Sequence, residues 1–595
     1  MHSRRLGRIG VCVACFVVVL AGPGLAGSLP FWPLVLSSSG STVPVASGIE
    51  YSHFAVTTTA GPLDIHHLRV DLSNPTVRLG EALAHDQLMS DDEPVSSMAR
   101  RTRAIAGVNG DYFDIHGSGM PINIVVKDRK LVRSPSGWVA LAINQDGSAR
   151  IVRYRWTGSV VLPDTRESYA LAGFNTGFVT NGLVAVSNIR GYGAPVPDRG
   201  SRQAVVELTP GDDVAARFFV SPEQTEVLPA TSDTGDYIVK RVLVQQPYYA
   251  PFPTDALIIV GRGAAVDWLL QKMTPGRHVQ VNLTTDPDWH GFQLAIGGGP
   301  QLVRDGEVIA DPYAPAAGER DRRYPVAAVG IGRDGRTVLL VEVDGRQPHL
   351  SIGLTPAQLA VYLRRLGAFQ AMELDSGGSA TMVVRLPGQL VPSVVNSPSD
   401  GRERPVANAL LVYTTAVPGP MVRLLVNDGQ PLRLFTGASA RLAVIGVDAQ
   451  GNPVQPLPPV QIMTPPRLTT LIPGDLVRAG RLPGTGLVRV QSGPTTGQTS
   501  LTVVTTLSRL AVVPGAVVVA PGATRTLTLR SNDADGQPIA LPERAASWAV
   551  TPGWLGAVSP AGEFVAGGTP GTGTIRVMLG GATSEVPVMV QRLGK

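Results

Sequence analysis

The chain has 595 residues and a formal charge of +5, with 44% hydrophobic, 16% charged and only 5% aromatic residues. This length is too great for one hydrophobic core, and about three to five domains are expected. Abundant glycine (67) and proline (50) indicate a loop-rich, strand-rich protein and argue against a helical cytosolic enzyme. Because the sequence contains no basic run and no ladder of basic and aromatic residues, nucleic acid is not an expected partner.

The N-terminus predicts a secretory signal peptide over residues 1–27. Three arginines precede an apolar run, and small residues follow it. The protein is therefore expected outside the cytoplasm, secreted or in the cell envelope, with a signal anchor that stays in the membrane as the alternative. Both cysteines, Cys12 and Cys15, lie inside the apolar run. A cleaved product would therefore contain no disulfide, catalytic thiol or cysteine–zinc site.

The next segments predict a linker and then a mixed domain. Residues 28–47 are rich in serine, glycine and valine and are typical of a linker. Residues 48–417 alternate short β-prone runs with few helical patterns, which predicts a strand-rich α+β domain. Within it, Gly332-Arg333-Asp334-Gly335 joins two apolar runs as a hairpin turn. Thr355-Pro356 begins a helix, because threonine caps a helix N-terminus and proline suits its first position.

Beyond residue 417 the sequence predicts two all-β modules, over residues 418–505 and 506–595. The two stretches share an internal repeat, seen in Asp448-Ala-Gln-Gly-Asn-Pro and Asp533-Ala-Asp-Gly-Gln-Pro. Alternating strands in a repeat of this length fit two β-sandwiches in tandem. These modules resemble the immunoglobulin-like modules of bacterial surface proteins. A role as spacers between a catalytic domain and an envelope is favoured over dedicated ligand binding.

Three predicted strands of the mixed domain end in polar loops that carry acids. Glu373-Leu374-Asp375-Ser376-Gly377-Gly378-Ser379 follows one apolar run. Strand alternation places Glu373 and Asp375 on one face, and the two glycines allow a sharp turn and the close approach of a ligand. Asn109-Gly110-Asp111 follows a second run, and Asp344-Gly345-Arg346 follows a third. The residues alone fit either a site or ordinary strand ends.

Glycine-rich and basic segments accompany these acids. Gly297-Gly298-Gly299 would present backbone N–H groups to an anion. Arg323 and Arg404 precede predicted strands, and a guanidinium suits phosphate because its planar donors bind two oxygens together. His116 is a candidate proton carrier. His66-His67 falls inside a strand pattern and is expected to be structural, and the nine histidines show no spacing typical of a zinc site.

In this order, five motifs resemble those of the phosphodiester glycosidase family. They are Asn109-Gly-Asp-Tyr-Phe, Gly297-Gly-Gly-Pro with Asp305-Gly306, Val343-Asp-Gly-Arg, Leu374-Asp-Ser-Gly-Gly-Ser and Arg404-Pro-Val-Ala-Asn. The resemblance covers residues 48–415 and implies a hydrolase that acts on a sugar-1-phosphodiester. Ser376 departs from the family's usual third glycine. Pro325-Val326-Ala327 lacks the family's usual arginine. If that arginine binds phosphate, Arg322 or Arg323 must replace it, or the substrate differs.

The resemblance and the chemistry together suggest a role for each residue. Two carboxylates commonly serve the sugar in glycoside hydrolysis. We expect catalysis by Asp375 and Asp344, as acid, base or nucleophile, with Asp111 as the third acid. The expected substrate-binding residues are Arg323, Arg346, Arg404 and the amides of Gly297, Gly298 and Gly299 for the phosphate, and Asn109, His116, Gly377, Gly378 and Ser379 around the sugar.

Several alternatives stay open at this stage. The sequence requires no cofactor, but the carboxylates could instead hold a divalent cation, Ca²⁺ or Mg²⁺. The expected partner is a phosphorylated glycan or an envelope polysaccharide. A non-catalytic envelope protein that binds glycans through the same residues is the rival function. A hydrolase of ordinary glycosides is less favoured, because the basic groups would then have no phosphate to bind.

Overall fold

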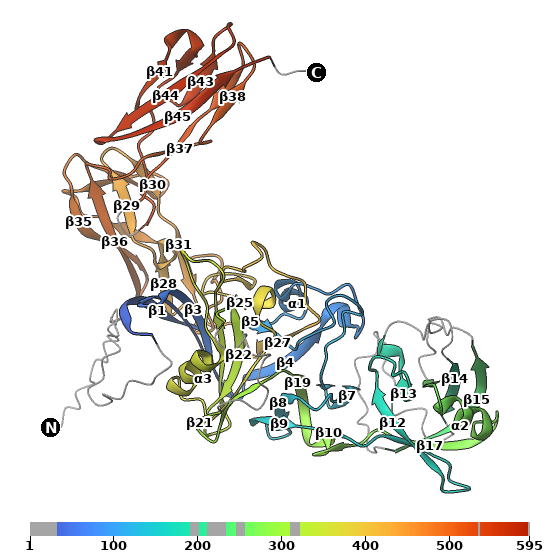
Figure 1. Cartoon of the computed structure of the whole chain (residues 1–595). Coiled ribbons are helices and arrows are strands. Elements are labelled where there is room, and N and C mark those ends of the chain that lie inside the picture. Colours follow the sequence, from blue (N-terminus) through green and yellow to red (C-terminus); the bar gives the residue numbers. More distant parts are fainter. Residues whose placement is uncertain are drawn as a thin grey trace, which may run out of the picture. The chain divides into compact units, whose positions relative to one another are not determined.

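The structure is a computed structural model that describes residues 33–190, 202–210, 234–245, 256–309, 322–533 and 536–592 (Figure 1). The signal peptide expected over residues 1–27 lies outside these residues. Contacts divide the chain into two units, Met1–Val417 and Pro418–Lys595. The described residues form three α-helices: α1 (Val95–Arg101), α2 (Ala265–Lys272) and α3 (Pro356–Arg365). None of them is both long and apolar enough to cross a bilayer. This confirms the prediction of a strand-rich chain with few helices.

The largest sheet of the first unit has eight strands in the order β1-β2-β3-β23-β22-β24-β20-β21. They are β1 (Val35–Ala46), β2 (Ile49–Thr58), β3 (Gly61–Asp71), β23 (Thr337–Val343), β22 (Val326–Ile331), β24 (Gln370–Glu373), β20 (Gln301–Arg304) and β21 (Glu307–Val308). The expected hairpin is confirmed as β22 and β23. Thr355 and Gln358 form a capping box at the start of α3, as the Thr355-Pro356 pair predicts.

The prediction of a linker over residues 28–47 is wrong for residues 35–46, which form β1. Residues 35–46 pair with β2 over ten positions as the edge of the sheet. Only Val45 and Ala46 at the end of β1 are buried, while its serines and glycine are exposed or half-buried. An edge strand with so little buried surface has no hydrophobic alternation, and its composition is that of a linker.

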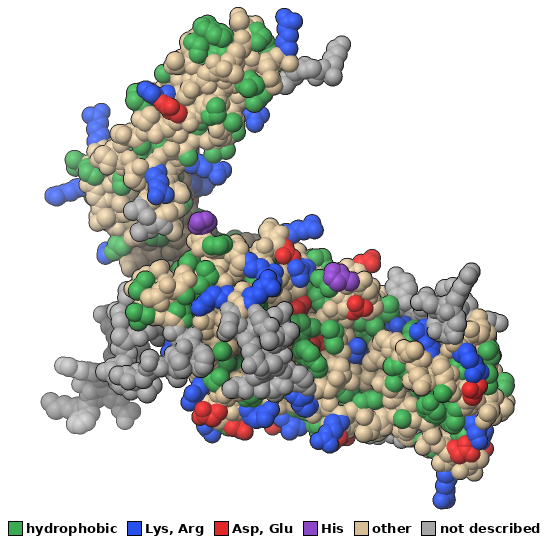
Figure 2. Space-filling model, in the orientation of Figure 1, with side chains coloured by type: hydrophobic (Ala, Val, Ile, Leu, Met, Phe, Trp, Pro, Cys, Tyr) green, Lys and Arg blue, Asp and Glu red, His purple; other side chains and the backbone are tan. Residues whose placement is uncertain are grey.

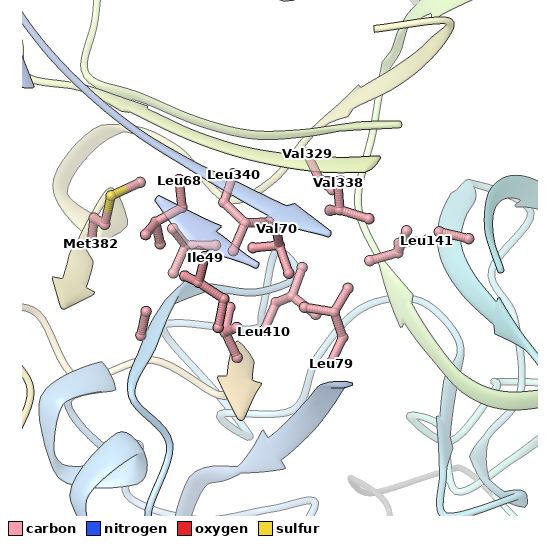
Figure 3. Packing of buried hydrophobic residues seen from close by; sticks show 14 of the residues in the cluster. Ile49, Leu68, Val70, Leu79, Leu141, Val329, Val338, Leu340, Met382 and Leu410 are labelled. Carbon is pink, nitrogen blue, oxygen red and sulfur yellow. The ribbon is translucent and has the colours of Figure 1, made fainter. Parts of the chain in front are cut away.

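Two five-stranded sheets complete the main body of the first unit. One has the order β26-β25-β5-β27-β4 and the other the order β7-β6-β19-β8-β9. Their bounds are β26 (Ser393–Val394), β25 (Met382–Val384), β5 (Ala106–Asn109), β27 (Asn408–Thr414), β4 (Val77–Leu83), β7 (Lys130–Arg133), β6 (Val125–Lys127), β19 (Phe292–Gly297), β8 (Val139–Asn144) and β9 (Ala149–Arg153). Figure 3 shows their shared core, where Leu340 and Leu68 of the large sheet, Leu410 and Leu79 of β27 and β4, and Leu141 of β8 converge.

A closed barrel is inserted between β9 and β19, in the order β11-β12-β13-β16-β14-β15-β17. Its strands are β11 (Ser159–Val161), β12 (Ser168–Phe174), β13 (Gly182–Val186), β16 (Leu257–Arg262), β14 (Gln203–Pro210), β15 (Thr234–Val244) and β17 (His278–Asn282). The short pair β10 (Arg155–Trp156) and β18 (Thr285–Asp286) flanks the insertion. The barrel has its own core, which includes Leu183, Ile259 and Leu269 of α2. Separate β segments are visible in the sequence here, but their closure into a barrel is not.

The second unit, residues 418–595, is all-β and contains two matching sets of sheets. The first set is β28-β31, β29-β36-β35-β32 and β30-β34-β33, and the second is β37-β40, β38-β45-β44-β41 and β39-β43-β42. The bounds are β28 (Arg423–Val426), β29 (Leu432–Phe435), β30 (Ser439–Arg441), β31 (Val444–Val447), β32 (Gln461–Met463), β33 (Thr469–Ile472), β34 (Leu476–Ala479), β35 (Gly484–Ser492), β36 (Thr495–Val504), β37 (Ala511–Val513), β38 (Val517–Val519), β39 (Thr524–Thr526), β40 (Thr528–Arg530), β41 (Ser547–Thr551), β42 (Gly556–Val558), β43 (Glu563–Ala566), β44 (Gly571–Leu579) and β45 (Ala582–Val590). The all-β character is confirmed; an immunoglobulin-like fold stays a prediction.

The surface itself shows no single charged region on the face drawn in Figure 2. Basic and acidic side chains are interspersed there.

Candidate active site

The loops after β5 and β24 are bound to each other, although 264 residues separate Asn109 from Glu373 in the sequence. Asn109 ends β5 and is completely buried. Its amide donates to the carbonyl of Asp375 at 2.5 Å and accepts from the backbone N–H of Thr381 at 3.1 Å. The N–H of Asp375 donates to the carbonyl of Gly110 at 3.0 Å. Two of the predicted polar loops therefore meet. Asn109 holds them together, rather than facing a sugar as expected.

Asp111 is a buried carboxyl beside this junction. Its N–H donates to Oδ1 of Asn408, at the start of β27, at 2.9 Å. Its Oδ2 accepts from the N–H of Asn123 at 2.7 Å. Burial raises the pKa of Asp111 to about 7, and the charge of Asp375 adds to the shift while Arg133 opposes it. Asp111 is thus close enough to Asp375 for the two charges to interact.

Glu373 and Asp375 are the other two acids of the site. Glu373 is buried and accepts a hydrogen bond from Ser376 Oγ at 2.8 Å. Burial raises the pKa of Glu373 to about 7, opposed by hydrogen bonds from Ser376 and Tyr324 and reinforced by the charge of Asp375. Asp375 is half-buried. Burial raises its pKa to about 6, opposed by Ser379 and Arg404. Three coupled carboxyls with raised pKa values are a common mark of a catalytic site.

Two guanidinium groups lie against the Gly377-Gly378 backbone next to these acids. A Cβ atom at Gly378 would overlap the guanidinium of Arg404, and one at Gly377 would lie 3.0 Å from Arg346 Nη2. Gly377 also has a φ of +70°, which favours glycine. Arg404 donates to Ser379 Oγ at 3.3 Å and pairs with Asp400 at 2.7 Å. The glycines therefore allow two cations to approach the loop that carries Asp375.

The anion cradle expected from Gly297, Gly298 and Gly299 is wrong for two of these residues. The N–H of Gly298 donates to the carbonyl of Val139 at 3.2 Å, and that of Gly299 donates to the carbonyl of Glu373 at 2.8 Å. At Gly297, a Cβ atom would overlap the Asp111 carboxyl. These glycines let the end of β19 pack closely against the acids, and the amides of Gly298 and Gly299 are already used.

Arg323 and His116 have surroundings other than those expected. Arg323 donates to Gln358 Oε1 at 2.7 Å and to the carbonyl of Gly353 at 3.3 Å, so it supports the N-terminus of α3. His116 is exposed in a turn, and no hydrogen bond or ion pair of the described residues joins it to Asp375. Arg323 is therefore engaged by residues at the start of α3, and a role for His116 stays a prediction.

Asp344 belongs to a different cluster. Its carboxyl accepts from the N–H of Ser397 at 2.8 Å and from the amide of Asn396 at 3.1 Å. Burial raises its pKa, and the charged groups that act on it are His66 and Asp64 rather than Asp375. Because Asp344 directly follows β23, its side chain shares a face with Glu342, and its Oδ2 lies 4.0 Å from Nε2 of His66 on β3. The pairing of Asp344 with Asp375 is not supported, and Glu373 stands in its place.

The sequence did not assign roles to several residues of the site. From the sequence, Glu373 is distinguished only by sharing a strand face with Asp375, and Asn408 only as the last residue of the Arg404 motif. Tyr112 is half-buried and lies edge-on to Trp138, with ring centroids 5.8 Å apart. The only feature of the sequence that points to Tyr112 is its position directly after Asp111. Tyr324 carries no local signal, because its contact with Glu373 depends on sheet pairing.

Comparisons with known proteins relate part of the chain to a family and the first unit to a known fold. Residues 219–413 match the family model described as phosphodiester glycosidase. A hypothetical protein from Synechocystis is similar at 19% identity and a TM-score of 0.50, over 64% of this chain and 64% of that protein. A protein from Burkholderia pseudomallei is similar at 22% identity and a TM-score of 0.51, over 65% of this chain and 98% of that protein.

A zebrafish catalytic domain, that of N-acetylglucosamine-1-phosphodiester alpha-N-acetylglucosaminidase, aligns at 17% identity with a TM-score of 0.31, over 63% of this chain and 88% of that domain. The comparison with curated proteins gives no match. The Synechocystis and Burkholderia pseudomallei structures support the fold of the first unit. The family model covers Glu373, Asp375 and Arg404. The match over residues 219–413 relates this part of the chain to the phosphodiester glycosidase family.

Proposed function

We propose that the protein hydrolyses a sugar-1-phosphodiester in extracytoplasmic glycans, breaking the bond between the anomeric carbon and the phosphate oxygen. The family domain supports a phosphodiester glycosidase-like function in general. The observation that carries the finer proposal is the position of Asp375. This half-buried acid is coupled to two buried acids and adjoins a loop against which two guanidiniums lie.

Asp375 is the carboxylate that acts at the anomeric carbon. With a pKa of about 6 it is mostly ionised at pH 7. It then stabilises the cation-like sugar, as nucleophile or as base for water. Glu373 and Asp111, with pKa values of about 7, hold a proton for part of the time at neutral pH. They supply the proton reservoir that acid–base catalysis needs.

Arg404 and Arg346 fit the phosphate side of the reaction. A departing phosphodiester is a weak base, so it needs charge stabilisation more than protonation. Planar guanidiniums can bind two phosphate oxygens together. Arg404 donates a hydrogen bond to Ser379 in the loop that carries Asp375. Arg346 is exposed, and its guanidinium lies close to Gly377. Tyr112 adds a half-buried aromatic ring for the sugar.

The test is turnover of a panel of sugar-1-phosphodiesters, read as free reducing sugar. We expect Asp375→Asn to lower kcat by about 10²-fold or more, because the amide cannot act as base or nucleophile. Asp128→Asn is the matched control, since Asp128 is exposed in a turn with a φ of +49° that asparagine tolerates. It should retain full activity.

Glycan recognition without catalysis is the rival that this experiment separates. A folded wild-type protein that binds a sugar-1-phosphodiester and releases no reducing sugar would replace hydrolysis with binding. Equal turnover by wild type and Asp375→Asn would instead remove Asp375 from the mechanism. Export is tested independently, by sequencing the N-terminus of the protein recovered from outside the cytoplasm.

A further inference from the structure

A second cluster of acids and histidines lies on the eight-stranded sheet. His53 of β2 is directly opposite His66 of β3, and His66 is directly opposite Glu342 of β23. Because strand side chains alternate, Asp64 shares the face of His66, and Asp344 shares that of Glu342. Three neighbouring strands thus bring three carboxyls and two imidazoles together.

The atoms of this cluster are spaced as ligands around one ion would be. One ligand atom each from His66, Glu342 and Asp344 lie within 4.8 Å of one another. His66 Nε2 is 3.6 Å from Asp64 Oδ2 and 4.0 Å from Asp344 Oδ2. These separations are too long for hydrogen bonds. They suit ligands that each lie about 2.0–2.2 Å from a shared metal ion.

The most buried members of the cluster each have side-chain atoms without a hydrogen-bond partner. Glu342 is 0% exposed, and neither of its carboxyl oxygens forms a hydrogen bond of good geometry in the described part of the chain, although Asn396 and Asp344 approach it. The Nε2 of His66, a residue 2% exposed, is also unpartnered. Among the described residues, no lysine or arginine forms an ion pair with Asp64, Glu342 or Asp344. A buried carboxyl without a well-formed hydrogen bond or an ion pair to lysine or arginine, as at Glu342, is costly, and a bound cation would reduce that cost.

Neighbouring side chains fix the cluster in this arrangement. The hydroxyl of Tyr51 lies 2.7 Å from Nδ1 of His66, so the ring is held with Nε2 turned to the acids. A hydrogen bond at the far nitrogen is the usual support of a metal-bound histidine. His53 holds Asp64 by an Nε2–Oδ1 contact of 2.5 Å. The side chain of His53 is 41% exposed, so the cluster reaches the surface there.

We propose that this cluster is a divalent-metal site, in which His66 Nε2, Glu342 and Asp344 hold the ion and Asp64 offers a further oxygen. A mixed imidazole and carboxylate set suits Zn²⁺ or Mn²⁺ better than Ca²⁺ or Mg²⁺, which prefer oxygen ligands alone. The ion joins β3 to the end of β23. Through Asp344 it also supports Asn396, which donates to the carbonyl of Ala380 beside the candidate active site.

The first test is metal content, measured by mass spectrometry after dialysis of the full chain against Zn²⁺, Mn²⁺, Ca²⁺ or Mg²⁺ in turn. We expect about one Zn²⁺ or Mn²⁺ per chain in the wild type and at least a tenfold lower content in Glu342→Gln. Glu50→Gln is the matched control, because Glu50 is an exposed acid on the neighbouring strand β2. It should bind the ion as the wild type does.

The second test is thermal unfolding with and without the ion, which stays informative if a variant binds weakly. A hundredfold excess of free ion over its Kd should raise the Tm of the wild type by about 5 °C and leave Glu342→Gln unchanged. After chelation, Glu342→Gln should be at least as stable as the wild type, because it lacks the unpartnered buried carboxyl. A wild type that binds no ion and shows no shift in Tm would overturn the site. Binding of Ca²⁺ or Mg²⁺ alone would overturn the assigned class of metal.

Discussion

Asp375, Glu373 and Asp111 titrate as a coupled group, and this sets the pH dependence of the reaction. Hydrolysis needs an ionised Asp375 and a proton on a neighbour, so kcat/KM should peak between about pH 6 and 7, the pKa values of the group. Arg404 lowers the pKa of Asp375. Arg404→Gln should therefore move the acidic limb of the profile to higher pH. A limb that stays in place in this variant would contradict the role of Arg404.

The raised pKa of Glu373 also makes the stability of the folded protein depend on pH. Its pKa in the folded protein, about 7, lies above the ordinary value of 4.5, so folding favours its protonated form. Its contribution to stability is therefore greatest below about pH 4.5, falls as the pH rises to about 7, and stays low above that. Glu373→Gln should be more stable than the wild type at pH 8, by up to about 3 kcal/mol, and equally stable at pH 4.

Denaturant unfolding at the two pH values measures this difference. Turnover should fall in the same variant, because the exchangeable proton is lost. Glu307→Gln is the control, since the Glu307 side chain is 77% exposed. If Glu373→Gln and the wild type were equally stable at both pH values, burial of the ionised Glu373 carboxyl would carry no cost in stability.

At the level of elements, the loop from β24 to β25 depends on the small size of its glycines. Gly378→Ala would push the Arg404 guanidinium away from the loop, because the added methyl group occupies its place. The clash involves the end of a flexible side chain, so the loss should be mainly in KM, by roughly tenfold, with little change in Tm. Gly177→Ala, where a Cβ atom meets nothing within 4 Å, is the control. A loss of stability as large as the loss of activity would argue against this account.

Local signals predicted the elements of the site better than the residues that meet there. The hairpin of β22 and β23 and the cap of α3 follow from a few adjacent residues, and both are confirmed. Which acid lies beside Asp375 depends instead on the order of the strands in the sheets. Asp344 meets His66 because β23 pairs with β3, whose residues lie about 270 positions earlier. The sequence of neither strand predicts that pairing by itself.

At the scale of the whole molecule, all the candidate site residues lie in the unit Met1–Val417. The second unit contains none of them, and its two halves are less separate than the repeat suggests. Their buried residues form one hydrophobic cluster, from Leu424 to Val590. Arg433 of the first half pairs with Asp533 of the second, and the N–H of Phe435 donates to the carbonyl of Ala540 at 2.9 Å.

This shared core predicts that residues 418–595 unfold in one cooperative transition. Phe435 is 6% exposed, and its ring packs against Gly580 of the second half, where a Cβ atom would lie 2.5 Å away. Phe435→Ala should cost about 3 kcal/mol, and the cost should appear in both halves because they unfold together. Calorimetry of the fragment 418–595 should show one peak that shifts as a whole. Two peaks, of which only one responds to the substitution, would mean that each repeat folds as an independent domain.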